Sequence, residues 1–114
     1  MEPIIRHLTP ESALRLDAQV EIQPGQIVSK TLAQNSAVSL TLFAFDQGEE
    51  ISSHDSDGDA MITVLEGTSE ITIADEKYTL RGGESIVMPA QKPHAVYAAE
   101  PFKMLLTVVF PPQQ

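Results

Sequence analysis

The chain of 114 residues contains no cysteine, and it has only 7 lysines and arginines against 16 aspartates and glutamates. Without cysteine there is no disulfide, no thiolate nucleophile and no zinc site built from thiolates. The formal net charge of −9 argues against binding to the phosphate backbone of nucleic acids, which needs clustered lysine and arginine, and against an anionic membrane surface. We therefore expect no nucleic acid and no membrane among the partners.

Long apolar runs are also lacking, since none approaches the roughly 18 residues of a membrane-spanning helix. The first residues, Met1 to His7, do not show the basic and then apolar order of a secretory signal peptide. We accordingly expect a cytoplasmic protein. Hydrophobic residues make up 42% of the chain and charged residues 20%, which is typical of a globular protein, and the length predicts one domain over residues 1–114.

Helical periodicity is almost absent. The segment Thr9-Pro10-Glu11 is typical of a helix start, because it combines a hydroxyl cap, a proline in the first turn and an acid near the positive end of the helix. We therefore predict a short helix from Pro10 to Leu16, within an N-terminal preamble that covers residues 1–20. After this segment no convincing helical period appears.

Residues 21–110 consist of short apolar stretches separated by turn residues, a pattern that predicts an all-β fold. Within residues 37–45 apolar side chains alternate and share one face of a strand. Residues 48–59 are expected to form a polar, acidic loop, and residues 74–76 the turn of a hairpin. The predicted strands cover residues 26–32, 37–45, 60–65, 70–73, 77–80, 85–88, 94–98 and 103–110. This spacing is typical of a β-sandwich or β-barrel.

Two stretches of the sequence match a pair of spaced motifs. In the first motif, G-x5-H-x-H-x3-E-x6-G, the matching residues are Gly48, His54 and Gly67. In the second motif, G-x5-P-x-G-x2-H-x3-N, they are Gly83, Pro89 and His94. On these residues, which span nearly half of the chain with their spacer, the protein resembles the cupin superfamily, and in particular its small single-domain members.

The resemblance implies a jelly-roll barrel of two antiparallel sheets and a homodimer. It also implies a site inside the barrel, because in metal-binding cupins three histidines and one glutamate hold a divalent cation, often iron, manganese, nickel or zinc. This chain departs from that set at half of its positions. Ser56 stands at the second histidine position and Ala60 at the glutamate position, while Gln91 and Ala98 replace the glycine and the asparagine of the second motif.

The metal ligands that the resemblance transfers are therefore His54 and His94 alone. Structural zinc commonly takes four protein ligands and catalytic zinc three, so two imidazoles make a reduced site. Asp59 precedes the lost glutamate position, and we keep it as a remote third ligand at the mouth of the strand, where the alternation of side chains is least strict.

A small eight-stranded barrel has room for one small ligand. The residues that we expect around this ligand share the inward face of their strands or the two motifs, and they are His54, Ser56, Ala60, Ile62, His94 and Val96. Val64, Ala98, Met104, Leu106 and Val108 are expected to fill or line the same interior. Alanines at positions 60 and 98 leave space beside the two histidines, as in a ligand pocket.

Three interpretations of His54 and His94 follow. They are fold residues that bond to each other, to water or to the backbone; they form a reduced metal site completed by water or substrate; or they bind a polar or anionic ligand without metal and act as acid and base near neutral pH. Two function classes remain open. One is a small-molecule enzyme of unassigned reaction that acts on a small polar ligand, with His54 and His94 either holding a divalent metal or serving as acid and base. The other is a metal-free, non-catalytic module that binds or senses a small molecule.

Overall fold

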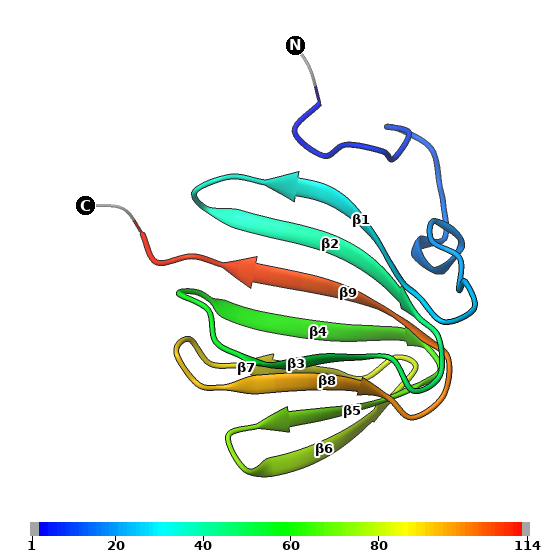
Figure 1. The fold of residues 1–114 in the computed structure, drawn as a ribbon. Coiled ribbons are helices and arrows are strands. Elements are labelled where there is room, and N and C mark those ends of the chain that lie inside the picture. Colours follow the sequence, from blue (N-terminus) through cyan, green and yellow to red (C-terminus); the bar gives the residue numbers. More distant parts are fainter. Residues whose placement is uncertain (1–2, 113–114) are drawn as a thin grey trace.

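The computed structural model describes residues 3–112, and they form nine strands and one 3-10 turn (Figure 1). The strands are β1 (Ile27–Gln34), β2 (Val38–Phe45), β3 (Glu50–His54), β4 (Asp59–Glu66), β5 (Thr68–Ile73), β6 (Glu76–Arg81), β7 (Ser85–Met88), β8 (His94–Ala98) and β9 (Phe102–Val109). The predicted all-β fold is confirmed, and eight strands lie within two residues of their predicted bounds.

The strands build two antiparallel sheets that face each other. One sheet has five strands in the order β1-β2-β9-β4-β7, and the other has four in the order β3-β8-β5-β6. The strands run from left to right in Figure 1, so that the loops gather at the left and right ends of the sheets. In the described part of the chain, no helix is long and apolar enough to cross a membrane.

The main core lies between the two sheets, because each strand directs every second side chain inward. Strand β4 shows this alternation clearly, with Ala60, Ile62 and Val64 buried. The rings of Phe45 and Phe102 stack in this core, with centroids 4.6 Å apart. Together these apolar side chains supply the hydrophobic free energy that holds the sheets together.

A second apolar cluster lies on the outer face of the five-stranded sheet. Leu42 and Ala44 of β2 are fully buried there, together with Leu32 of β1 and Val20 of the N-terminal segment. The predicted alternation in residues 37–45 is thus present, but its apolar face points away from the barrel and is covered by the N-terminal segment. On the opposite face of β2, Phe45 enters the main core.

The helix predicted from Pro10 to Leu16 is wrong. Residues 9–15 are exposed and form turns and irregular backbone, and the 3-10 turn lies at Leu16–Ala18. Glu11 adopts a φ of 57°, in the left-handed region, which ends any helix that begins at Pro10. A helix of two turns costs too much to nucleate without an apolar face to bury.

The loop predicted over residues 48–59 is also wrong in part, because residues 50–54 form strand β3 and pair with β8. Polar residues in this segment do not alternate with apolar ones, so the sequence gives no sign of the strand.

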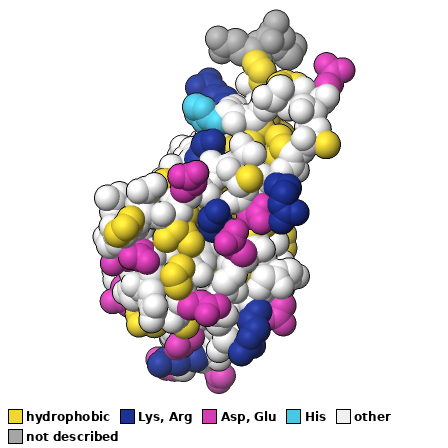
Figure 2. Space-filling model, turned by 90° about the vertical axis from the view of Figure 1, so that its right-hand side faces the viewer, with side chains coloured by type: hydrophobic (Ala, Val, Ile, Leu, Met, Phe, Trp, Pro, Cys, Tyr) yellow, Lys and Arg dark blue, Asp and Glu magenta, His cyan; other side chains and the backbone are white. Residues whose placement is uncertain are grey.

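Figure 2 shows one face of the molecule, where acidic side chains are spread over the barrel and hydrophobic side chains remain visible on the N-terminal segment. Ile4 of that segment is 72% exposed.

Gly67 is required by the turn between β4 and β5. Its φ of 82° lies in the left-handed region, and a Cβ at this position would stand 2.7 Å from the Cα atom of Phe102 and would collide with the carbonyl oxygen of Pro101. A side chain is therefore excluded here both by conformation and by space. This explains in physical terms why the first motif ends in glycine.

Candidate functional site

His54 and His94 meet at one end of the barrel. His54 is the last residue of β3 and His94 the first of β8, and the two residues are direct partners in the antiparallel pairing of these strands. Their Nε2 atoms are 3.2 Å apart, and the ring planes are inclined by 70°. The sequence motifs that lie forty residues apart thus supply one pair of contacting imidazoles.

A β-bulge in β3 sets the direction of His54. Ile51 pairs with Val96 and His54 with His94, so β3 uses three steps where β8 uses two. The extra residue turns His54 to the face that regular alternation would give to Ser53. The bulge also places the Ser52 carbonyl oxygen 3.0 Å from Nδ1 of His54.

Each of the two rings has a backbone carbonyl oxygen beside its Nδ1 atom. Nδ1 of His54 faces the Ser52 carbonyl oxygen, and Nδ1 of His94 faces the Lys92 carbonyl oxygen at 3.3 Å. A carbonyl oxygen only accepts, so in the tautomer that forms both of these bonds each Nδ1 carries a hydrogen and each Nε2 of a neutral ring presents a lone pair; a hydrogen on one Nε2 instead lets one ring donate to the other. Two lone pairs that converge at 3.2 Å favour a hydrogen-bond donor or a cation at that point.

The two histidines differ in their environment. His94 is buried, with 4% of its surface exposed, whereas His54 is exposed at the rim. Burial lowers the pKa of His94 below its ordinary value, and the nearby His54 ring lowers it further. The Lys92 carbonyl and the charge of Asp55 act in the opposite direction on this pKa without cancelling the effect. The lowered pKa favours the neutral form of His94 at pH 7.

A cavity of about 70 Å³ lies next to the pair, inside the barrel. All six residues that the sequence predicts around a ligand line this cavity, and the other lining residues are apolar. The lining residues are Ile51, His54, Ser56, Ala60, Ile62, Met88, His94, Val96, Met104, Leu106 and Val108. Pockets for drug-sized ligands measure roughly 300–1,000 Å³, so this cavity admits a very small molecule or one end of a larger one.

Ile51 is a lining residue that the sequence did not reveal. It is a single apolar residue in a polar segment, and only the pairing of β3 with β8 shows that it points inward. Val64 and Ala98 do not line the cavity, but they are buried in the core around it. The expected interior residues are thus divided between the cavity wall and the packing behind it.

The described residues do not fit the four-ligand metal set that the resemblance implies. Residues 3–112 contain no group of three histidines, cysteines, aspartates or glutamates that could hold a metal ion. Asp59, the remote third ligand of the sequence prediction, does not line the cavity, and its Oδ1 accepts a hydrogen bond of 2.8 Å from the Ala90 amide. The Ser56 hydroxyl donates to the Gly58 carbonyl. Of the predicted metal ligands, only the two imidazoles therefore remain free to bind a metal ion.

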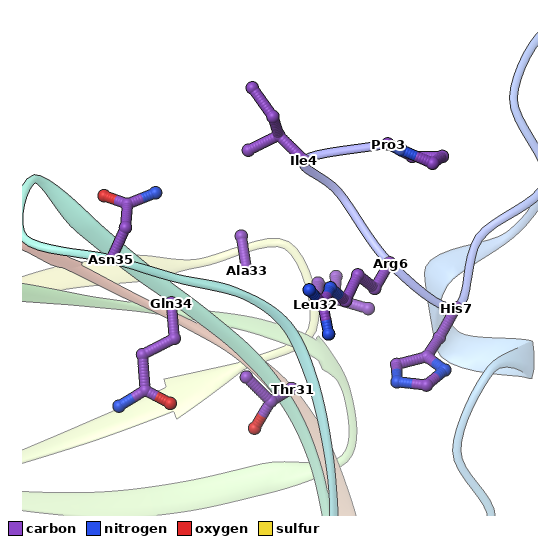
Figure 3. A pocket seen from close by; sticks show the side chains of 9 residues that line it. All are labelled: Pro3, Ile4, Arg6, His7, Thr31, Leu32, Ala33, Gln34 and Asn35. Atoms are coloured by element: carbon purple, nitrogen blue, oxygen red, sulfur yellow. The ribbon is translucent and has the colours of Figure 1, made fainter. Parts of the chain in front are cut away.

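A larger pocket of about 600 Å³ lies between residues 3–7 and strand β1 (Figure 3). The Arg6 amide donates to the Leu32 carbonyl at 2.7 Å, which ties the N-terminal segment to this edge strand. The side chains of Arg6 and His7 lie at the pocket and are exposed. No motif in the sequence indicated this pocket, and it shares no lining residue with the histidine cavity.

The comparisons with known proteins agree with the two motifs. The family model described as "Cupin domain" matches residues 41–110, which is more than half of the chain. The chain belongs to the cupin family. The resemblance that the sequence suggested is thus confirmed, and the two facing antiparallel sheets are the cupin barrel.

The solved structures similar to this cupin include the following three. A conserved protein of unknown function from Streptococcus pyogenes is 45% identical, with a TM-score of 0.95 and 98% of each chain covered. A cupin superfamily protein from Desulfitobacterium hafniense is 33% identical, with a TM-score of 0.90, 94% of this chain and 98% of that chain covered. A cupin 2 conserved barrel domain protein from Leptotrichia buccalis is 40% identical, with a TM-score of 0.82, 84% of this chain and 47% of that chain covered. No curated protein matches.

Proposed function

We propose that this cupin binds a small polar molecule at the mouth of its barrel, with His54 and His94 as the recognition point. The observation that carries the proposal is the pair of Nε2 atoms 3.2 Å apart, with each Nδ1 turned to a carbonyl oxygen. Both rings then accept hydrogen bonds from the same place. A hydroxyl, amine or amide group of a ligand supplies the hydrogens that this place favours.

The cavity supports the proposal by offering room for the apolar end of such a ligand. Ile62, Val96 and Met104 are fully or almost fully buried and form part of its wall. A ligand that inserts a short apolar end removes that end from water, while its polar group stays at the rim with the imidazoles. Since His94 is neutral and His54 lies at the rim, the pair can also accept a proton from the ligand in a reaction.

A divalent metal is the second candidate, and one distance favours it. Two nitrogen ligands about 2.05 Å from a tetrahedral ion lie about 3.3 Å apart, which is close to the observed 3.2 Å. A backbone carbonyl on the other ring nitrogen is also the usual partner of a metal-ligating histidine. Iron, manganese, nickel or zinc would still need ligands from water or from a bound molecule, so no step of the proposed function depends on a metal.

Elemental mass spectrometry decides between the two candidates. Wild type, His54→Ala and His94→Ala are purified without chelator or affinity tag and then incubated with iron, manganese, nickel and zinc. The proposal expects no stoichiometric metal in any of the three. About one metal ion per chain in wild type, lost in both variants, would replace the metal-free proposal with the metal site.

A homodimer and a cytoplasmic location are the other expectations from the sequence, and both stay predictions. The outer face of the five-stranded sheet supports a homodimer, because it exposes the neighbouring side chains of Met61 and Val87 by 39% and 53%.

An enzyme and a non-catalytic binding module would use the same ligand site. They differ in whether the bound molecule is changed, so the identification of the ligand comes first.

A further inference from the structure

A third pocket, of about 530 Å³, lies at the same end of the barrel as the histidine pair. It is formed by three loops and the segment after β9, all of which lie at the left end of the ribbon in Figure 1. Its lining residues are Asn35, Ser36, Asp57, Gln91, Phe110 and Pro111. Ser56 lines the inner cavity while its neighbour Asp57 lines this outer pocket, so the β3–β4 loop contributes to both.

Gln91 is the unusual residue of the outer pocket. Its φ of 65° lies in the left-handed region, and the Lys92 amide donates to the Pro89 carbonyl at 3.3 Å. This is the third position of a type II turn, which favours glycine or asparagine. The second cupin motif has glycine here, so this chain carries a long side chain where the backbone would adopt its conformation more easily without one.

The side chain of Gln91 is not needed to hold the turn. The Gln91 amide donates to the Ser56 carbonyl at 2.9 Å, and the Ala90 amide donates to the Asp59 carboxylate at 2.8 Å. Both bonds start from backbone atoms and survive the loss of the side chain. Among the hydrogen bonds of residues 3–112, none involves the exposed carboxamide of Gln91. Left-handed strain is tolerated at functional positions, and of the four non-glycine residues with positive φ in the described chain only Gln91 lines this outer pocket.

We infer that Gln91 is a specificity-determining residue, which binds the outer part of the ligand whose inner end lies at the histidine pair. This inference rests on the proposed function. The carboxamide both donates and accepts hydrogen bonds, whereas the Asp57 carboxylate beside it only accepts. Neither pocket is lined by lysine or arginine, so nothing in the lining neutralises a carboxylate or phosphate. The ligand is therefore a molecule that carries a hydroxyl, amine or amide group and no negative charge.

Titration of histidine-labelled and amide-labelled protein with defined probes, followed by NMR, tests this inference. Glycerol and ethanolamine are the hydroxyl-bearing probes, and acetate is the anionic one. We expect the first two to shift the signals of His54, His94 and the Gln91 carboxamide, and acetate to shift none of them. In Gln91→Gly the dissociation constants for glycerol and ethanolamine should rise about tenfold, and Gln91→Asn should recover part of the affinity.

The fold of the variant is checked by thermal unfolding. Gln91→Gly relieves the left-handed strain, so its midpoint should not fall below that of wild type. Glu11→Gly is the matched control, because Glu11 has a φ of 57° and lies in the N-terminal segment outside both pockets. This control should keep the wild-type affinity.

The outcomes separate the inference from the proposed function. If the probes shift both histidines but bind equally well to Gln91→Gly, Gln91 does not determine specificity while the histidine site stands. Tighter binding of acetate than of glycerol and ethanolamine would overturn the ligand class. If no probe shifts His54 or His94, the proposed histidine site is wrong, and the assignment of Gln91 is overturned with it.

Discussion

Filling the histidine cavity should stabilise the protein and abolish ligand binding. Ala60 lies on the cavity wall with 2% of its surface exposed, and its strand neighbours Met88 and Val108 line the same cavity. Ala60→Val adds two methyl groups, which need about 60 Å³ if each takes the roughly 30 Å³ of a water molecule in the liquid. The cavity of about 70 Å³ accommodates them.

The expected gain follows from the apolar groups that become buried. At about 0.8 kcal/mol for each group, two groups add about 1.6 kcal/mol to the free energy of unfolding. For a chain of this length that corresponds to a rise of about 6 °C in the thermal midpoint. Urea unfolding and thermal unfolding measure the gain, and the glycerol titration measures the loss of binding.

Ala98→Val is the matched control. Ala98 is fully buried in the same core and also lies on a strand, but it does not line the cavity. The same two methyl groups then overpack the core and cost about 1–3 kcal/mol. The reasoning is refuted if Ala60→Val destabilises the protein as much as Ala98→Val does, because the space beside Ala60 would then not be available to a side chain.

Two further predictions concern a turn and the pH dependence of stability. Gly67→Ala should lower the free energy of unfolding in urea by more than about 2 kcal/mol, since left-handed strain adds to the collision with the Phe102 backbone. Gly25 has a φ of 68° and open space around it, so Gly25→Ala should lower the free energy of unfolding only by the strain of about 1 kcal/mol. Equal losses of stability in the two variants would contradict the collision at Gly67. For His94, whose folded pKa lies below the ordinary 6.5, the unfolded chain binds more protons, so stability is constant above about pH 7 and falls as the pH drops through 6.5. Urea unfolding between pH 5 and 8 should show this slope in wild type and a flatter one in His94→Gln, and equal slopes would exclude His94 as its cause.

Much of the fold could be predicted from the sequence because turn residues and apolar alternation are local signals. Strands β7 and β8, for example, have the predicted bounds. The two errors have physical causes that are not local. Strand β3 is held by its pairing with β8 rather than by apolar alternation. The expected N-terminal helix does not form because residues 9–15 bury no apolar face.

The candidate site could also be predicted only in part from the sequence. The resemblance to the cupin motifs implied that His54 and His94 share one site, and the structure pairs the two residues. The carbonyl partner of His54 could not be predicted, since the bulge that offers the Ser52 carbonyl appears only in the paired strands. The strain at Gln91 was equally hidden, because a departure from a motif does not reveal whether the backbone keeps its left-handed conformation.

The position of β9 has a consequence for the synthesis of this protein. Residues 102–109 form the middle strand of the five-stranded sheet and bond to β2 on one side and to β4 on the other. The ribosome makes this strand after all the others, so β2 and β4 wait with open edges until it emerges. Open edges and unburied apolar side chains promote aggregation. The larger sheet is therefore completed only after residue 109 has been made, and until then the edges of β2 and β4 stay open to contacts with other chains.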